Sequence, residues 1–334
     1  MARVARFHQV GGPEVLRVEE VPTPEPGPGE VLIETRALGL NRAELEFRAG
    51  RYGQPSLPSG IGFEAAGVVR AVGAGVAHVA PGAAVSVLPA FGPGTYALHG
   101  DAVLAPADAV VEHPPNLSWE QAAAVWMSCT TAYGGLVETA GVSAGDVVLI
   151  PAASSGVGLA AIQLCTALGA RPIALTRTGG KRSALRGAGA AEVIATAEQD
   201  VVAEVRRLTG GRGARVAFDP VGGAGFTDLS AALAPGGIAV VYGTLAGGTT
   251  PLPVGDVLAK GLTIRGYALF ETTGDPDRRT AAIEFLHAHL ADGTLVPHIG
   301  ATFPFDRIAD AHTHMESTTH LGKIVLRTDR QARP

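Results

Sequence analysis

Apolar and polar positions change their pattern part-way along the chain. In residues 1–124 the apolar stretches are short: residues 31–37 alternate in part between apolar and polar, and residues 65–72 and 85–88 are further apolar runs. Short runs of this kind, bounded by glycine and proline, are typical of β-strands. A capping box, Ser118-Trp119-Glu120-Gln121, opens an alanine-rich stretch. We therefore expect a β-rich N-terminal region that ends in a helix.

From residue 147 onward, strands and helices are expected to alternate. The clearest helix has Val157, Ala161, Leu164 and Leu168 on one face and stops at Gly169. Six such strands predict a parallel sheet with right-handed crossovers, and six is the strand number of a Rossmann dinucleotide-binding unit. The candidate strands are residues 147–150, 172–175, 192–194, 216–219, 238–242 and 262–267.

Composition limits the possible locations and partners. Residues 147–170 carry no charge and could cross a bilayer by length, but proline, serine and glycine in the middle favour a strand, a turn and a helix. Cys129 and Cys165 form no CxxC pair, and the N-terminus lacks the apolar core of a signal peptide. The net charge is −5, without a basic cluster. We expect a cytoplasmic protein with no membrane segment and no nucleic-acid partner.

A glycine-containing turn connects the first expected strand of the alternation to the following helix. In Ser155-Gly156-Val157-Gly158, backbone N–H groups and the positive end of the helix dipole are placed where a pyrophosphate binds. Ala153 and Ser155 occupy the first two glycine positions of the G-x-G-x-x-G pattern, so the motif alone is weak. Its place in a six-strand alternation predicts a dinucleotide site.

The end of the second expected strand indicates which dinucleotide binds. An NAD site usually has a carboxylate there, which binds the ribose 2′-hydroxyl. Here the strand ends at Thr176 and Arg177, and Lys181 follows. A guanidinium and an ammonium are suited to a 2′-phosphate, so the sequence predicts NADPH. The alternative is that Arg177 and Lys181 are ordinary solvated surface charges.

Seven short motifs are spread along nearly the whole chain. They are Leu40-Asn41-Arg42-Ala43-Glu44, Arg48-Ala49-Gly50-Arg51-Tyr52, Gly62-Phe63-Glu64-Ala65-Ala66-Gly67, Gly94-Thr95-Tyr96-Ala97, Thr131-Ala132-Tyr133, Phe218-Asp219-Pro220-Val221-Gly222 and Gly322-Lys323-Ile324-Val325-Leu326. Together and in this order they resemble the zinc-independent medium-chain dehydrogenase/reductase family, in its quinone oxidoreductase (zeta-crystallin-like) branch.

The resemblance implies an α/β fold with two domains and an active site in the cleft. A GroES-like β-barrel catalytic domain would be formed by both chain ends, residues 1–124 and 268–334. A Rossmann NADPH-binding domain would occupy residues 125–267. The resemblance also implies a homodimer through the edge strand at residues 262–266, because an exposed apolar edge otherwise invites aggregation.

The departures from the family concern metals. Zinc-dependent relatives have Cys where this chain has Asn41 and His where it has Phe63, and neither replacement is a good zinc ligand. We therefore predict no catalytic metal. His312 and His314 could pair as a metal site on one face of a strand. However, Asp310-Ala311-His312 resembles the C-terminal helix of the family, in which His312 would be a packed residue.

Without zinc, the resemblance implies hydride transfer from NADPH to an already activated acceptor, a quinone or an α,β-unsaturated carbonyl. Asn41 could donate an amide N–H to the acceptor oxygen. Tyr52 occupies a position where related enoyl reductases have a tyrosine that orients or protonates substrate; the alternative is a tyrosine on the barrel surface. Further cofactor contacts implied by the resemblance are Thr131, Gly243 and Thr244 near the nicotinamide, and Lys323 near the cleft.

Two other functions stay open on the sequence. One is an enoyl-thioester reductase of polyketide or fatty-acyl assembly, although no basic groove for a carrier is evident. The other is a cofactor-binding protein with little reductase activity or a non-redox biosynthetic role, since a fold does not determine a function.

Overall fold

The computed structural model describes residues 1–328, which form two compact units. Unit 1 comprises Met1–Met127, Thr273–Ala291 and the chain from Val296 on, so both chain ends build it. Unit 2 comprises Ser128–Thr272 and Asp292–Leu295. The sequence placed these boundaries at 124/125 and 267/268, and residues 329–334 of its first domain lie outside the described residues.

Unit 2 is built on a six-stranded sheet, β11-β10-β9-β12-β13-β14, with parallel pairing throughout. If the strands are renumbered 1 to 6 from β9 to β14, this is the strand order 3-2-1-4-5-6 of a Rossmann fold. All six predicted strands are present, with ends shifted by a few residues. The strands are β9 (Val147–Ile150), β10 (Arg171–Thr176), β11 (Glu192–Ala195), β12 (Ala214–Asp219), β13 (Leu233–Val241) and β14 (Thr263–Gly266).

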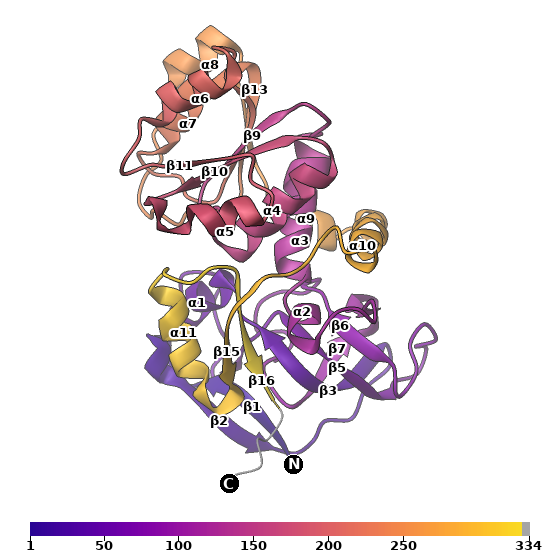
Figure 1. The fold of residues 1–334 in the computed structure, drawn as a ribbon. Coiled ribbons are helices and arrows are strands. Elements are labelled where there is room, and N and C mark those ends of the chain that lie inside the picture. The colour runs from indigo at the N-terminus through magenta and orange to yellow at the C-terminus, as the bar shows by residue number, and fades with distance from the viewer. Residues whose placement is uncertain (329–334) are drawn as a thin grey trace. The chain divides into compact units, whose positions relative to one another are not determined.

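Helices cover both faces of this sheet. Figure 1 shows α4 and α5 on one face and α6, α7 and α8 on the other. Apolar side chains such as Leu149, Ile173 and Phe226 form the core between the layers. The helices of this part are α3 (Trp126–Tyr133), a π-helix (Gly134–Thr139), α4 (Gly156–Ala167), α5 (Arg182–Gly187), α6 (Val201–Thr209), α7 (Phe226–Ala232), α8 (Val254–Lys260) and α9 (Phe270–Thr273).

Unit 1 is β-rich, as its alternating pattern predicts. One sheet has the order β15-β16-β3-β5-β6-β8, with β7 also paired to β3, and a second sheet has the order β2-β1-β4. The strands are β1 (Ala2–Phe7), β2 (Leu16–Val21), β3 (Glu30–Gly39), β4 (Ser59–Gly60), β5 (Glu64–Val72), β6 (Ala84–Val87), β7 (Ala102–Pro106), β8 (Val110–Glu112), β15 (Ile299–Pro304) and β16 (Lys323–Arg327).

Four α-helices complete the described part of unit 1: α1 (Arg42–Arg48), α2 (Trp119–Ala122), α10 (Pro276–Ala291) and α11 (Ile308–Glu316). The predicted capping box at Ser118 is present, but its helix ends at Ala122, and α3 begins at Trp126. The strand alternative for His312 and His314 is wrong, because both lie on α11. Among residues 1–328, no helix is both long and apolar enough to span a bilayer.

Candidate active site

Three buried polar side chains meet in unit 1, and we call them the lysine cluster: Asn41, Glu64 and Lys323. Lys323 Nζ lies 2.6 Å from both Asn41 Oδ1 and Glu64 Oε1, and Asn41 Nδ2 donates to Glu64 Oε1 over 2.9 Å. Strand pairing brings them together, because Gly39 at the end of β3 lies opposite Glu64 on β5 and Val325 on β16. None of the three is more than 5% exposed.

Glu44, in the first turn of α1, borders the lysine cluster. Its Oε2 accepts the backbone N–H of Asn41 over 3.0 Å, and its Oε1 accepts the N–H of Phe63 over 3.1 Å. Burial raises the pKa of this carboxyl to about 7, although the Asn41 N–H and the charge of Lys323 act in the opposite direction. The group is therefore only partly ionised at neutral pH.

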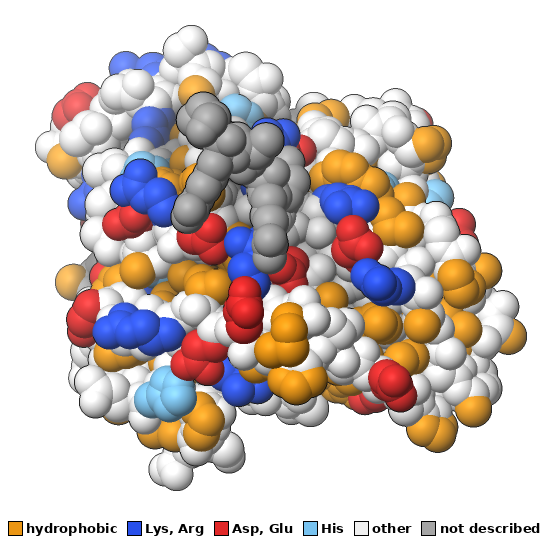
Figure 2. All heavy atoms as spheres, turned by 90° about the horizontal axis from the view of Figure 1, so that it is seen from below, with side chains coloured by type: hydrophobic (Ala, Val, Ile, Leu, Met, Phe, Trp, Pro, Cys, Tyr) orange, Lys and Arg blue, Asp and Glu red, His pale blue; other side chains and the backbone are white. Residues whose placement is uncertain are grey.

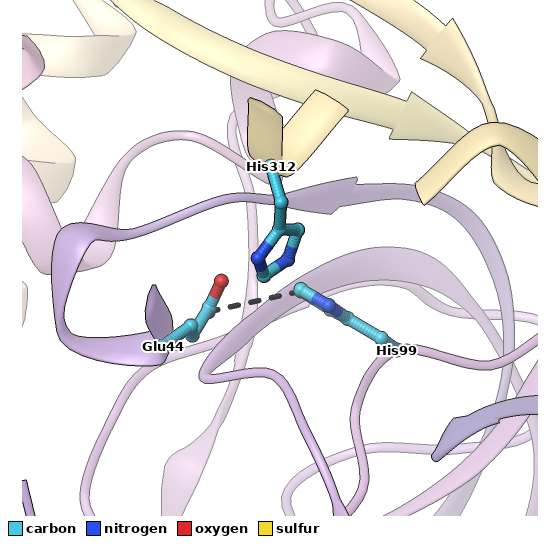
Figure 3. A group of neighbouring side chains, drawn as sticks. All are labelled: Glu44, His99 and His312. Atoms are coloured by element: carbon cyan, nitrogen blue, oxygen red, sulfur yellow. Dashed lines mark ion pairs between the residues drawn. The ribbon is translucent and has the colours of Figure 1, made fainter. Parts of the chain in front are cut away.

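Two buried histidines lie beyond Glu44, as Figure 3 shows. His99 Nε2 is 3.7 Å from Glu44 Oε1 and 3.3 Å from the carbonyl oxygen of Gly39. Burial lowers the pKa of His99 to about 4, and burial, followed by the charges of His99 and Arg48, lowers the pKa of His312 well below its usual value. Both rings are therefore neutral at pH 7.

The ligand atoms of Glu44, His99 and His312 lie within 4.8 Å of one another, which is close enough to hold a metal ion. The Arg48 guanidinium is 2.8 Å from His312 Nδ1. Since arginine only donates, Nδ1 must accept, which assigns the proton to Nε2. A metal on Nε2 would force that proton onto Nδ1, against the arginine. The tautomer that Arg48 imposes on His312 therefore does not fit a metal centre, and within residues 1–328 His312 Nε2 and His99 Nδ1 are buried without a hydrogen-bond partner.

Zinc-dependent relatives have zinc ligands at two positions, which are Asn41 and Phe63 in this chain. Asn41 Oδ1 already accepts from the Lys323 ammonium, and Phe63 offers no donor atom. A cation bound to Asn41 would face the positive charge of Lys323. The residues of the lysine cluster do not fit zinc.

Tyr52 stands apart from the lysine cluster, in the segment that follows α1. It is 39% exposed, and partial burial raises the pKa of its phenol, so the hydroxyl stays protonated at neutral pH. Within the described chain no hydrogen bond joins Tyr52 to Asn41. The sequence had grouped the two residues as the catalytic pair.

In unit 2 the predicted cofactor residues gather at the carboxyl ends of the parallel strands, where α/β sheets bind ligands. The turn after β9 holds Ala152 at a φ of 48°, a left-handed value that is unusual for alanine. Ser155 then caps α4, with its Oγ accepting from the Gly158 N–H over 3.0 Å. A Cβ on Gly158 would lie 2.6 Å from the carbonyl oxygen of Ala153, so glycine lets α4 begin tightly against the turn. The N-terminus of α4, Gly156 and Val157 included, fits a pyrophosphate.

Two cations follow β10, as the sequence predicts. Thr176 ends the strand, Arg177 is exposed, and the Lys181 ammonium donates to Ser154 Oγ over 3.0 Å. Partial burial and then the neighbouring charge of Arg177 lower the pKa of Lys181. An anion bound beside these two side chains would relieve their repulsion. A phosphate therefore fits here.

The other implied cofactor residues lie on different elements. Gly243 and Thr244 follow β13, and a Cβ on Gly243 would be 2.7 Å from the carbonyl oxygen of Pro220, so only glycine fits. Thr131 is buried on α3. Lys323 belongs to unit 1, in the lysine cluster.

Comparisons with known proteins identify the family. Residues 27–207 match the alcohol dehydrogenase GroES-like domain, and residues 156–288 match the family described as zinc-binding dehydrogenase. Quinone oxidoreductase 1 of Escherichia coli (strain K12) is 33% identical over 98% of this chain and 99% of its own length. The chain belongs to the quinone oxidoreductase branch of the medium-chain dehydrogenase/reductase family.

Two solved structures match this chain, and their descriptions name different nicotinamide cofactors. The Escherichia coli quinone oxidoreductase complexed with NADPH matches with a TM-score of 0.90 at 32% identity, over 98% of this chain and 100% of that one. A structure described as an NAD-dependent alcohol dehydrogenase matches with the same four values. The predicted family, the fold class and the assignment as an oxidoreductase are confirmed.

Three carboxylates of these sites were missed as functional groups by the sequence. Glu64 was visible as a charge immediately before the apolar run at residues 65–72, and Glu44 as the last residue of an Asn-x-x-Glu capping box. Glu198 was the hardest to find, because it follows β11 and reaches the loop after β10, where it accepts the Gly179 N–H over 2.9 Å. A carboxylate from the segment after β11 thus contacts the loop that carries Arg177 and Lys181.

Proposed function

We propose that this protein is an NADPH-dependent reductase that transfers hydride to a quinone or to an α,β-unsaturated carbonyl. The observation that supports the cofactor is the Lys181 ammonium, hydrogen-bonded to Ser154 beside Arg177 at the end of β10. Ser155, Gly156, Val157 and Gly158 would hold the pyrophosphate. The acceptor class is supported by membership of the quinone oxidoreductase branch.

Bound NADPH would supply the hydride, and the chain supplies position and charge. Thr176, Arg177 and Lys181 would bind the adenosine 2′-phosphate, and Thr131, Gly243 and Thr244 the nicotinamide end. The buried charges of the lysine cluster would act on the oxygen of the acceptor. No metal enters this scheme, because the donor atoms of the cluster already bind the Lys323 ammonium.

The test is the loss of NADPH absorbance with a panel of quinones, enones and enoyl thioesters, with NADH run in parallel. Turnover of a quinone or enone with NADPH preferred supports the proposal. Preference for NADH would overturn the cofactor assignment, and turnover of thioesters alone would overturn the acceptor assignment.

The face in Figure 2 shows acidic and basic side chains interspersed rather than gathered by sign.

Replacing Arg177 with alanine is expected to lower the preference for NADPH over NADH by roughly 10- to 100-fold, because one charge-assisted hydrogen bond to the 2′-phosphate is lost. The kcat/KM for each nucleotide measures the change. Glu198→Gln is the matched control: it removes the carboxylate that accepts the Gly179 N–H in the loop of Arg177, and it should leave the preference unchanged or increase it. An unchanged ratio in the Arg177 variant would remove Arg177 from the site.

Replacing Tyr52 with phenylalanine is expected to lower kcat by roughly tenfold or more, because the protonated hydroxyl would orient the acceptor. Tyr96→Phe is the control, since the Tyr96 hydroxyl donates to Glu30 instead. Steady-state kinetics with a saturating acceptor provide the measurement. Equal kcat values for wild type and the Tyr52 variant would mean that Tyr52 is a surface residue.

We also propose that two copies pair through β14. This strand is the edge of the sheet of unit 2, and all four of its residues are exposed, Ile264 among them. Leu252, Val254 and Leu258, on or just before α8, are exposed as well. Sedimentation velocity would show a dimer, and a monomer at micromolar concentration would contradict this.

A further inference from the structure

The lysine cluster holds one hydrogen-bond donor more than it uses. A lysine ammonium has three N–H groups. Lys323 Nζ has two acceptors, Asn41 Oδ1 and Glu64 Oε1, each 2.6 Å away. Within residues 1–328 no third acceptor lies within hydrogen-bond distance of this atom. One N–H of a buried cation is therefore left for a group that is not part of the described chain.

Asn41 has no donor to spare. Because Lys323 must donate, the Asn41 atom that faces it is Oδ1, and this fixes the orientation of the amide. The two hydrogens on Nδ2 then face three acceptors: Glu64 Oε1 at 2.9 Å, Glu44 Oε1 at 3.3 Å and the Gly39 carbonyl oxygen at 3.4 Å. The amide of Asn41 positions the ammonium instead of serving a ligand.

Glu64 is anchored as firmly. Its Oε2 accepts the backbone N–H of Met127 over 2.8 Å, while Oε1 holds Lys323 and Asn41. The carboxylate is fully buried, so solvent does not compensate its negative charge. These hydrogen bonds and the charge of Lys323 do so instead. The ammonium is thereby held in one place by two rigid partners.

We propose that Lys323 is the hydrogen-bond donor and the proton source for the oxygen of the acceptor that this protein reduces. The inference rests on the proposed reductase function and deepens it. It moves the electrophilic role from Asn41 to Lys323, and gives Lys323 a contact with the acceptor in place of the cofactor contact that the resemblance implies. A fixed charge in a buried site stabilises a developing oxyanion more than water does.

The reaction balances with one proton from lysine. A new C–H bond forms at the electron-poor carbon of the acceptor, and the π electrons move to the oxygen. That oxygen takes a proton from Lys323 Nζ, which is left as a neutral amine beside Glu64. Water returns the proton to the amine, and the cofactor leaves oxidised. The charged or titratable groups that face Lys323 are Glu64, Glu44 and His99.

The experiment compares neutral and cationic variants of the Lys323–Glu64 ion pair in the full-length protein. Lys323→Met alone would leave the Glu64 carboxylate buried and unpaired, so the main variant is the double substitution Lys323→Met with Glu64→Gln. Lys323→Arg keeps the charge. Lys260→Met is the control substitution, because the Lys260 ammonium donates to backbone carbonyl oxygens of α7 and is not part of the lysine cluster.

Tryptophan fluorescence reports folding, and the affinity for NADPH is measured separately from turnover. We expect the double variant to fold and to bind NADPH normally, while kcat with quinone or enone falls at least roughly 100-fold, as loss of a general acid does. Lys323→Arg, which keeps a cation paired with Glu64, should lose less.

Two results would overturn the inference. The first is wild-type kcat in the double variant. The second is a loss confined to the affinity for NADPH, which would make Lys323 a cofactor contact. A wild-type protein that binds NADPH and reduces none of the acceptors would overturn the proposed function itself, which separates the two failures.

Discussion

Replacing Arg48 with methionine is expected to lower the free energy of unfolding of unit 1 by about 3 kcal/mol, since each buried acceptor left without a donor costs roughly 1–3 kcal/mol. Arg48 is 2% exposed, and its guanidinium donates to the carbonyl oxygen of Gly11, to His312 Nδ1 and to Glu316. Methionine fills much of the same volume but donates to none of them. Gly11 and His312 would then keep unpaired acceptors.

The measurement is a urea titration followed by tryptophan fluorescence. Both tryptophans of the chain, Trp119 and Trp126, lie in unit 1, so the signal reports this unit. Arg51→Met is the control on the adjoining turn, because Arg51 pairs with Glu46 at the surface, where an ion pair contributes at most about 1 kcal/mol. Equal midpoints for the two variants would show that the buried hydrogen bonds of Arg48 add little to stability.

The sequence predicted the Rossmann sheet closely, because each of its strands is an apolar run bounded by glycine or by polar residues. Three of the expected cofactor contacts, Ser155, Thr176 and Gly243, lie at or just after the carboxyl ends of its strands, where parallel sheets bind ligands. The sequence predicted where the helix after Ser118 begins, but not where it ends. A capping box marks where a helix begins, but Ala122 to Val125 are buried, so packing and not propensity decides where it ends.

The sequence could not predict which partners the buried polar groups have. Lys323 and Glu64 are 259 positions apart, and Arg48 and His312 are 264 apart. Only the register of β16, β3 and β5 brings the first pair together. A motif shows that Asn41 has chemistry to offer, but not that its two amide hydrogens already face acceptors. Glu198 was missed for the same reason, because its loop meets the loop after β10 only in the folded sheet.

Replacing Glu44 with glutamine is expected to change how the stability of unit 1 depends on pH. The pKa of this carboxyl is raised from 4.5 to about 7 in the folded protein, so between these values the folded state keeps a proton that the unfolded chain has lost. This contribution to stability is fully present below pH 4.5 and is lost as the pH rises through 7. A shift of this size corresponds to about 3 kcal/mol. Glutamine resembles the protonated carboxyl at every pH, so the variant should gain this amount relative to wild type across the interval.

The histidines act with the opposite sign. The pKa of His99 is lowered from 6.5 to about 4, and that of His312 is also lowered, so their contributions are present above pH 6.5 and are lost as the pH falls. In the wild type the terms of Glu44 and His99 oppose each other between pH 4.5 and 6.5. In the glutamine variant the histidines are unopposed. Its urea midpoint should therefore fall more steeply on acidification than that of the wild type.

Glu46→Gln is the matched control on the same helix. A hydrogen bond from Arg51 lowers the pKa of Glu46, so the wild type should gain slightly over this variant as the pH rises, the reverse of the Glu44 effect. Urea midpoints at pH 4.5, at 6.5 and above 7 distinguish the three proteins. If the Glu44 variant ran parallel to the wild type, Glu44 would be ionised throughout, and the buried network would carry one more negative charge next to Lys323 than we infer. That charge would hold the ammonium more tightly and make it a poorer proton donor, so this measurement also bears on the role proposed for Lys323.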